Sequence, residues 1–269
     1  MRFPRFALLA FAFTLIAHFA FAQQITVTVQ RDPQAIALAQ QTLAAMGSAQ
    51  ALLFQDSLAT GQAQIFKPDG TSTVLPITKK SKGTTMARTE LQRPEGTRIR
   101  IVNGGIGAIQ NPDGTVRPLF SNNTVAERIE HIPALSILCE WQSSNIEISH
   151  IGTDTINGNP VQVIALSLIP TSDPQWISLY RTTTQTLFYI DQATSLVSKI
   201  QYQNFAERDS NVSEKVEVFF SDYRLVNGVQ VPFKQASYAD GSLRSTLTFT
   251  SVSFNTGLSA SEFAVPGGN

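Results

Sequence analysis

Residues 214–249 read EKVEVFFSDYRLVNGVQVPFKQASYADGSLRSTLTF, and this stretch gives the clearest indication of the fold class. Apolar and polar residues alternate with a period of two through three runs, as in strands with one buried face. Asn227-Gly228 separates the first two runs and Asp240-Gly241 separates the last two, and both dipeptides favour tight hairpin turns. The stretch therefore predicts three sequential antiparallel strands, and it contains no catalytic motif.

The same pattern continues through most of the chain. Further turn signals between alternating runs are Asp69-Gly70, Pro94-Glu95-Gly96, Asn103-Gly104, Asp113-Gly114, Asn157-Gly158 and residues 191–194. They predict about ten strands, nearly all joined to their neighbours in sequence. Such strands form an antiparallel meander, which curls into a barrel or folds into a sandwich. The predicted class is mainly β (α+β), a curved antiparallel sheet with a few helices.

One helix is predicted near the start, in the sequence RDPQAIALAQQTLAAMGS of residues 31–48. Asp32 suits the N-cap, Pro33 suits the first helical position, and Gly47 suits the position just past the end. Apolar residues at helical spacing form one face: Ile36, Ala39, Leu43 and Met46. We expect the helix to lie on the sheet by this face.

A second helical segment, residues 124–140, interrupts the strands between the two halves of the chain. Pro133 disfavours helix at the residue before it, so we expect two short helices or a kink. Its apolar stripe consists of Ile129, Ile132, Leu135 and Leu138. We expect this segment to act as a lid whose stripe faces a cavity.

The N-terminal segment has the pattern of a secretory signal. Arg2 and Arg5 precede an apolar run from Phe6 to Phe21, and Ala20-Phe21-Ala22 forms an A-x-A cleavage site. The alternative is a membrane anchor, but the run is short for a span of about 20 apolar residues. We expect a signal peptide over residues 1–22, cleavage near Ala22, and one mature domain over residues 23–269 in the periplasm or outside the cell.

Charge and motif content argue against several function classes. The 20 basic and 20 acidic residues of the chain balance, and loss of the signal segment leaves two more acidic than basic residues, with no basic stripe for a nucleic acid. Cys139 is the one cysteine, so it forms no internal disulfide and reads as a small buried hydrophobe. His131 and His150 lack metal-ligand spacing, and we expect no metal and no cofactor.

No acyl-transfer motif is present, and we expect no enzyme activity. Glu214 and Glu217 are available for a glycosidase pair, but sequence does not place two carboxyl groups across a substrate. Solvated strand faces carry glutamate routinely, which is the ordinary interpretation of both residues.

Apolar strand faces are the positive signal. Leu243 shares a predicted face with Leu247 and Phe249. An ordinary core explains such faces, but a curved sheet with few helices also has a concave side that either side chains or a ligand must fill. The candidate cavity wall consists of Ile99, Ile101, Val216, Val218, Phe220, Leu247 and Phe249.

In its order of elements the chain resembles the outer-membrane lipoprotein carrier and lipoprotein-sorting (LolA-like) superfamily. The resemblance rests on the helix ending at Met46-Gly47, on SLATGQAQIF (57–66), on the strand run of residues 87–114, and on the helices between the halves. LFYIDQATSLVSKIQY (187–202) is similar to the family's D-x-x-T-x-L-V-x-x-I strand pair, and VSFNTGLSASEFAVP (252–266) to its terminal F-x-x-P.

The resemblance implies a half-open β-barrel around an apolar cavity, closed by a helical lid. It implies noncatalytic binding or transport of lipoprotein acyl chains or other lipid-like ligands across the periplasm, between a membrane donor and a receptor, by a monomer. The family's carrier has a lid-gating arginine soon after the first hairpin, whereas this chain has Lys79, Lys80, Lys82 and Arg88, and we expect the lysines to meet anionic head groups. The alternative is an envelope sensor or protein-interaction module on the same fold, with peptide addition at an open sheet edge.

Overall fold

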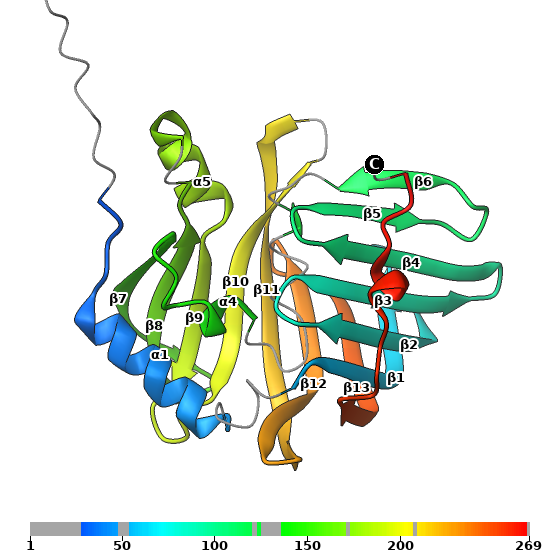
Figure 1. The fold of residues 1–269 in the computed structure, drawn as a ribbon. Helices are drawn as coiled ribbons and strands as arrows, with labels where there is room; N and C mark the ends of the chain where they lie inside the picture. Colours follow the sequence, from blue (N-terminus) through cyan, green and yellow to red (C-terminus); the bar gives the residue numbers. More distant parts are fainter. Residues whose placement is uncertain are drawn as a thin grey trace, which may run out of the picture.

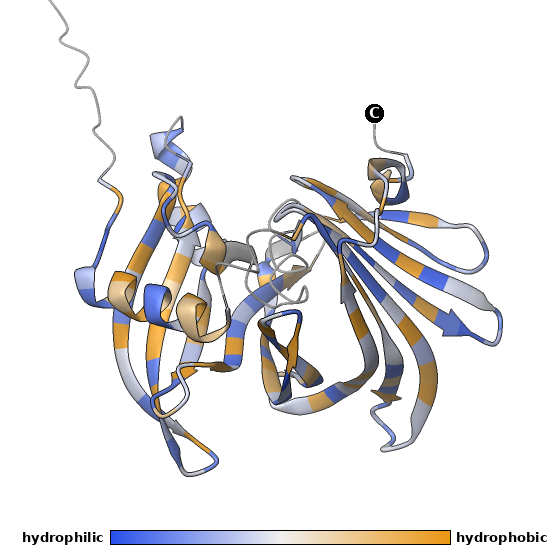
Figure 2. Cartoon of the chain, turned by 60° about the horizontal axis from the view of Figure 1, so that its bottom comes forward, coloured by the Kyte–Doolittle hydropathy of each residue, from blue (hydrophilic) through white to orange (hydrophobic). Residues whose placement is uncertain are grey.

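The computed structural model describes residues 28–47, 54–119, 123–124, 136–170, 173–206 and 209–267. The strands of these residues form one 13-stranded sheet in the order β6-β5-β4-β3-β2-β1-β13-β12-β11-β10-β9-β8-β7. Every neighbouring pair is antiparallel. The sheet is strongly curved and remains open between its edge strands β6 and β7 (Figures 1 and 2).

The strands are β1 (Asp56–Phe66), β2 (Ser72–Lys82), β3 (Met86–Arg93), β4 (Gly96–Asn103), β5 (Ile106–Gln110), β6 (Val116–Leu119), β7 (Ile146–Ile156), β8 (Asn159–Leu168), β9 (Thr186–Asp191), β10 (Val197–Ala206), β11 (Asp209–Val226), β12 (Val229–Ala239) and β13 (Ser242–Phe254). The helices are α1 (Pro33–Ala45), α4 (Ser136–Cys139), α5 (Ile177–Thr183) and the short 3-10 helices η1 (Pro174–Trp176) and η2 (Ala260–Phe263).

The chain fills the sheet in two passes. It runs outward from β1 to β6, and then returns from β7 at the other edge to β13, which pairs with β1. Residues 120–145 therefore connect the two edges of the open sheet. The predicted mainly β class and the curved antiparallel meander are confirmed.

Turn residues explain why the strands reverse where they do. Asn157, Asn227 and Asp240 each have positive φ angles, of 51°, 48° and 47°, and each is followed by a glycine that also has positive φ. Two successive positive φ angles match the right-handed twist of the flanking strands, which is why Asn-Gly and Asp-Gly mark hairpins. The alternating bands of hydropathy along the strands are visible in Figure 2. The predicted hairpins are therefore confirmed, while the short strands β5 and β6 help to raise the count above ten.

Helix α1 forms as its sequence predicts and covers part of the concave face. The Asp32 carboxylate accepts hydrogen bonds from the backbone N–H of Gln34 and Ala35 at 2.8 and 3.4 Å. The helix lies across β7 and β8 (Figure 1). Its buried residues join a core cluster with the inner faces of β7 to β11. This cluster comprises Ala35, Ala39, Leu43, Met46, Leu138, Ile146, Ile148, Ile164, Leu166, Phe188, Ile190, Val197, Ile200, Val216, Val218 and Phe220.

Gly47 fixes the end of α1 against the β11–β12 hairpin. Its φ is +85°, and a Cβ at this position would lie 2.2 Å from the Gly228 carbonyl oxygen. The neighbouring Met46 carbonyl accepts a hydrogen bond from the Gln230 N–H at 3.0 Å. Only glycine combines this backbone angle with this close approach.

The C-terminal segment covers the outer face of β3 and β4, where η2 packs and Phe263 is fully buried. The Asp56 carboxylate holds the start of this segment, because it accepts hydrogen bonds from the backbone N–H groups of Thr256, Gly257 and Leu258 at 2.6, 3.0 and 3.0 Å. The Glu262 carboxylate pairs with the Lys80 ammonium at 2.9 Å. The C-terminal segment therefore covers the outer face of the sheet at β3 and β4.

Helix α5 is not among the helices that the sequence predicts. Arg181 lies in α5, and its guanidinium makes two hydrogen bonds to the Glu147 carboxylate, at 2.7 and 2.8 Å. The Thr184 hydroxyl donates to the Tyr180 carbonyl at 2.7 Å and ends the helix. Tertiary contacts to β7 thus override the strand preference of the threonine run.

Candidate functional site

The strand register assigns side chains to the two faces of the sheet. Val218 lies opposite Ser237 on β12, and Ser237 lies opposite Ser245 on β13. Directly opposed residues point to the same face, so one row of side chains continues across these strands. A pocket formed by residues of β10 to β13 also includes Arg100 of β4, which is far away in the sheet order. This face is therefore the concave one.

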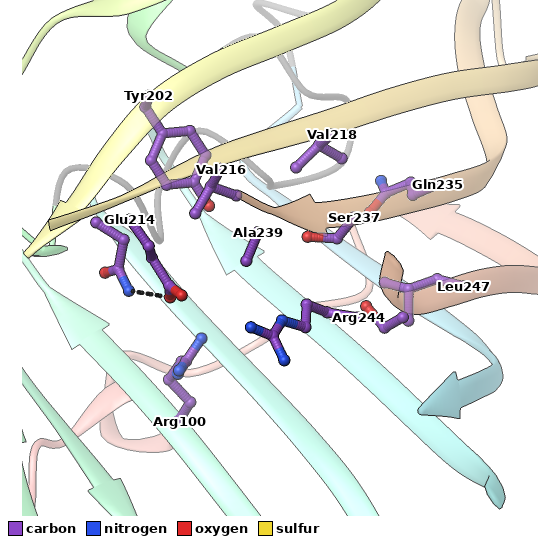
Figure 3. A pocket seen from close by; sticks show the side chains of 12 residues that line it. Arg100, Tyr202, Glu214, Val216, Val218, Gln235, Ser237, Ala239, Arg244 and Leu247 are labelled. Carbon is purple, nitrogen blue, oxygen red and sulfur yellow. Dashed lines mark hydrogen bonds between the residues drawn. The ribbon is translucent and has the colours of Figure 1, made fainter. Parts of the chain in front are cut away.

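The concave face holds two adjoining hollows with volumes of about 240 and 340 Å³. Arg100, Arg244, Ser245 and Leu247 line both of them. The smaller hollow is also lined by Tyr202, Asn204, Glu214, Val216, Val218, Gln235, Ser237 and Ala239 (Figure 3). The larger one is also lined by Ala63, Ile65, Ile77, Lys79, Thr89, Leu91 and Arg98. We call the two hollows together the concave pocket.

Five of the predicted wall residues lie on the concave face. Val216, Val218 and Leu247 line the pocket directly. Phe220 shares the face through its pairing with Gln235, and Phe249 through its pairing with Gly61, and both phenylalanines are buried in core clusters. The expectation that Val218, Phe220, Leu247 and Phe249 share one concave face is therefore met in this structure.

The placement of Ile99 and Ile101 in the cavity wall is wrong. Ile101 pairs with Arg88 and Ile99 with Glu90, whose side chains lie on the outer face that the C-terminal segment covers. Their strand neighbours Arg98 and Arg100 face the pocket instead. Because side chains alternate, an error of one residue exchanges the two faces of a strand.

Leu243 is also misplaced, and the reason is a bulge. Tyr238 pairs with Leu243, whereas Ser237 pairs with Ser245, so Arg244 is an extra residue in β13. The bulge shifts the alternation, which puts Leu243 on the face opposite Leu247 and turns Arg244 into the pocket (Figure 3). Alternation alone gave no signal for this shift.

Arg98, Arg100 and Gln235 line the pocket, although the sequence did not indicate them as site residues. Arg98 and Arg100 alternate with isoleucines in β4. This pattern indicates that the two faces of the strand differ, but it does not indicate which face is the concave one. Gln235 lines the smaller hollow and is 3% exposed. Neither its side-chain nitrogen nor its side-chain oxygen has a hydrogen-bond partner. The pocket therefore combines an apolar wall with arginines and one buried amide.

The structure separates Glu214 from Glu217. Glu214 lines the pocket, and its carboxylate accepts a hydrogen bond from the Asn204 amide at 3.1 Å (Figure 3). Glu217 lies three residues further along the strand, on the outer face, with the ammonium groups of Lys199 and Lys215 at 2.9 and 3.0 Å. Burial opposes ionisation of Glu217, but these hydrogen bonds outweigh it and lower its pKa. The two carboxyl groups therefore do not form a glycosidase pair across a substrate.

The cationic side chains of β2 and β3 point to both faces of the sheet. Lys79 is buried in the wall of the larger hollow. Lys80, Lys82 and Arg88 instead contact the C-terminal segment, where the Lys82 ammonium donates to the Leu258 carbonyl at 2.7 Å and the Arg88 guanidinium to the Glu262 carbonyl at 3.0 Å. The expected contact of Lys80 and Lys82 with ligand head groups is therefore wrong.

Catalytic and metal chemistry find little support in the described part of the chain. Burial, with the nearby Glu140 carboxylate, raises the pKa of the Cys139 thiol to about 11, which leaves it unreactive at neutral pH. His150 lies on β7, with its Nε2 2.8 Å from the Gln162 side-chain oxygen. No group of three or more metal-ligating side chains occurs among the described residues.

The predicted lid lies mostly outside the described residues, which exclude Ile129, Ile132, Leu135 and His131. Leu138 is described, and its side chain is fully buried in the core cluster beneath α1. Within the described ranges, the helices are all too short or too polar to span a membrane.

Comparison with known proteins identifies the fold through structure and not through sequence. No family model matches the chain, and no curated protein is similar to it. A solved domain described as an outer membrane lipoprotein-sorting protein from Vibrio parahaemolyticus matches with a TM-score of 0.56 and 15% identity, over 86% of this chain and 96% of that one.

Two further solved structures match at similar levels. A DUF1329 family protein from Desulfovibrio piger gives a TM-score of 0.56 at 14% identity, over 87% of this chain and 98% of that one. A LolA superfamily protein from Nitrosomonas europaea gives 0.54 at 13% identity, over 84% and 97%. The chain therefore has the LolA-like fold that its sequence motifs predict.

Proposed function

We propose that this protein is an exported, noncatalytic carrier that holds the acyl chain of a lipid or lipoprotein in its concave pocket. The observation that carries the proposal is the pocket itself, whose apolar wall lies on the concave side of an open sheet. Similarity to a lipoprotein-sorting domain and to a LolA superfamily protein supports the same function.

Acyl-chain burial supplies the driving force. Each buried methylene contributes about 0.8 kcal/mol, so a sixteen-carbon chain gains on the order of 12 kcal/mol when fully buried. A carrier must also release its cargo, and partial burial reduces the net affinity to roughly the micromolar range. Release then requires opening of the pocket or transfer from a membrane donor to a receptor with a better site.

The proposed binding surface has two parts. The wall comprises Val216, Val218, Phe220, Leu247 and Phe249. The lid, residues 124–140, would present Ile129, Ile132, Leu135 and Leu138 to the cargo, because this part of the chain connects the two edges of the open sheet. We further propose cleavage of residues 1–22, one mature domain over residues 23–269 in the periplasm, and a monomeric carrier.

A pair of substitutions in β13 tests the proposal. Leu247→Trp fills the pocket, while Thr248→Trp places the same side chain on the opposite, exposed face of the same strand. Loss of burial of two methylenes costs about 1.6 kcal/mol, so Leu247→Trp should weaken binding of a fluorescent fatty acid about tenfold. Thr248→Trp should leave the affinity unchanged.

The proposal fails if the wild-type protein binds no acyl ligand and carries none when purified from its export compartment and extracted for mass spectrometry. Equal effects of the two tryptophans would also contradict it, because the ligand would then not lie on the concave face. An interaction module would be the next hypothesis.

A further inference from the structure

We propose that the concave pocket selects an anionic amphiphile, with Arg244 binding a phosphate or carboxylate head group and Gln235 hydrogen-bonding a polar group next to the acyl chain. This inference rests on the proposed lipid-binding function and specifies its ligand class. Two independent observations support it: the bulge in β13 that directs Arg244 into the pocket, and the buried amide of Gln235 in β12.

Arg244 is directed into the pocket by the bulge in β13. The extra residue between the Ser237–Ser245 and Tyr238–Leu243 pairs changes the face of its side chain, and Arg244 lines both hollows. Figure 3 shows its guanidinium pointing into the pocket, toward the space that Arg100 also borders. Arg244 makes no ion pair or hydrogen bond with any described residue. A guanidinium is suited to phosphate or carboxylate, which it binds through two parallel hydrogen bonds.

Positive charges outnumber negative ones around the pocket. Its lining includes the cationic residues Lys79, Arg98, Arg100 and Arg244, and one carboxylate, Glu214. Lys79, Arg98 and Arg100 have interactions within the protein, so we assign the direct contact to Arg244 and a long-range attraction to the other three. A cavity lined by an excess of cations concentrates anions, and the low-dielectric wall strengthens the effect.

Gln235 is the independent observation that points to a ligand. Its side chain is 3% exposed and lines the pocket, yet both its amide nitrogen and its amide oxygen lack a partner. An unsatisfied buried polar group destabilises the folded protein, so native proteins seldom retain one without a role. The amide is placed to donate to an ester carbonyl or to accept from a hydroxyl of a bound molecule.

The spacing of these two groups fits one amphiphile. Gln235 lies opposite Leu247, which is three residues from Arg244, or about 10 Å along a strand. The long arginine side chain spans part of this separation. A ligand with a phosphate, a short glycerol unit and an acyl ester presents its groups in this order, with the apolar chain continuing onto β11 at Phe220, which lies opposite Gln235.

Two lipids that differ by one phosphate group test the inference. Oleoyl lysophosphatidic acid and monooleoylglycerol share one acyl ester, and only the first carries a phosphate. Each is titrated into the full-length mature protein below its critical micelle concentration. We expect lysophosphatidic acid to bind about tenfold more tightly, since one charge-assisted pair contributes about 1.5 kcal/mol. Arg244→Gln should reduce this preference to about twofold.

Lys234→Gln is the matched control, because it removes one positive charge from an exposed side chain on the outer face of β12. The preference should be unchanged in this variant. Gln235→Leu should weaken both lipids by a similar factor, because they share the ester. Circular dichroism and the melting temperature establish that each variant is folded.

Each other outcome overturns a stated part of the inference. Equal binding of the two lipids, unaffected by Arg244→Gln, contradicts the anionic selectivity and leaves the carrier function standing. Absence of binding by either lipid contradicts the carrier function as well. Binding of glycerol 3-phosphate alone, at the affinity of lysophosphatidic acid, would identify a site for free phosphate esters and would contradict recognition of an amphiphile.

Discussion

At the scale of single residues, Gln235 connects stability with binding. Its amide is buried and unsatisfied, so it destabilises the folded protein, and the surrounding Phe220 and Leu247 would accommodate an apolar side chain. We expect Gln235→Leu to raise the free energy of unfolding by about 1–2 kcal/mol and to weaken ligand binding. Thermal unfolding and lipid titration of the same sample measure both effects. A variant that is less stable than the wild type would show that the amide has a structural role instead.

Asp56 gives a prediction for the dependence of stability on pH. Burial disfavours its charge, but hydrogen bonds from Thr256, Leu258 and Gly257 outweigh this effect and lower its pKa. Because the folded pKa lies below the unfolded one, Asp56 stabilises the fold above the unfolded value of about 3.9, and this stabilisation is lost as the pH falls through the folded pKa.

Asp56→Asn should therefore cost about 1–3 kcal/mol at pH 7 and less at pH 3, where the wild-type carboxyl begins to take up its proton. Urea unfolding at both pH values measures the difference. A cost that is identical at pH 3 and pH 7 would show that the charge of Asp56 plays no part.

Single-residue placement is also where sequence reasoning failed most often. The period-two pattern identified the faces of β11 and β13 near Val218 and Leu247, because polar residues alternate clearly with apolar ones there. In β4 the outer face is covered by the C-terminal segment, so its side chains are apolar, while the inner face lines the pocket. Ile99 and Ile101 were therefore predicted to face inward, although they face outward. The bulge at Arg244 depends on pairing between strands, which a single sequence does not display.

Among the elements, the C-terminal segment stabilises the sheet by packing on the outer face of β3 and β4. Phe263 is fully buried there, whereas the neighbouring Glu262 makes a partly exposed ion pair with Lys80. Phe263→Ala should lower the free energy of unfolding by about 3–5 kcal/mol, because it leaves a cavity beneath η2. Glu262→Gln, the matched control, should cost less than about 1 kcal/mol.

Urea unfolding of the two variants checks this difference. If both variants lower the free energy of unfolding by a similar small amount, packing of the C-terminal segment on β3 and β4 contributes little to stability. The sequence identified this segment only as an ending similar to that of the LolA-like family, and its packing on the outer face required knowledge of the register.

Other elements were more predictable from local chemistry. Helix α1 begins and ends as its cap residues indicate, because Asp32 and Gly47 act through backbone geometry within one turn. Hairpins at Asn-Gly and Asp-Gly were predicted for the same reason. Helix α5 was missed because its position depends on the Arg181–Glu147 pair, which joins residues 34 positions apart.

In the molecule as a whole, the order of the strands explains why the barrel is open. The chain starts and ends its sheet at the central β1–β13 pair and leaves β6 and β7 as edges, with residues 120–145 connecting them. The meander was predictable from turn chemistry, and its order of elements indicated the LolA-like fold. The curvature that brings Arg100 of β4 to the pocket of β10 to β13 follows from the sum of many strand twists, which local patterns do not specify.

Photo-crosslinking shows directly whether a bound acyl chain lies on the concave face of the sheet. A palmitate analogue with a diazirine on its chain is irradiated with the mature protein, and the adducts are located by fragmentation mass spectrometry, with unlabelled palmitate as competitor. The proposed site predicts competable adducts on alternate residues that face the pocket, such as Val216, Val218 and Leu247, and none on Thr246 or Thr248. Adducts on Thr246 and Thr248, or no adduct that palmitate displaces, would contradict binding of the acyl chain on the concave face.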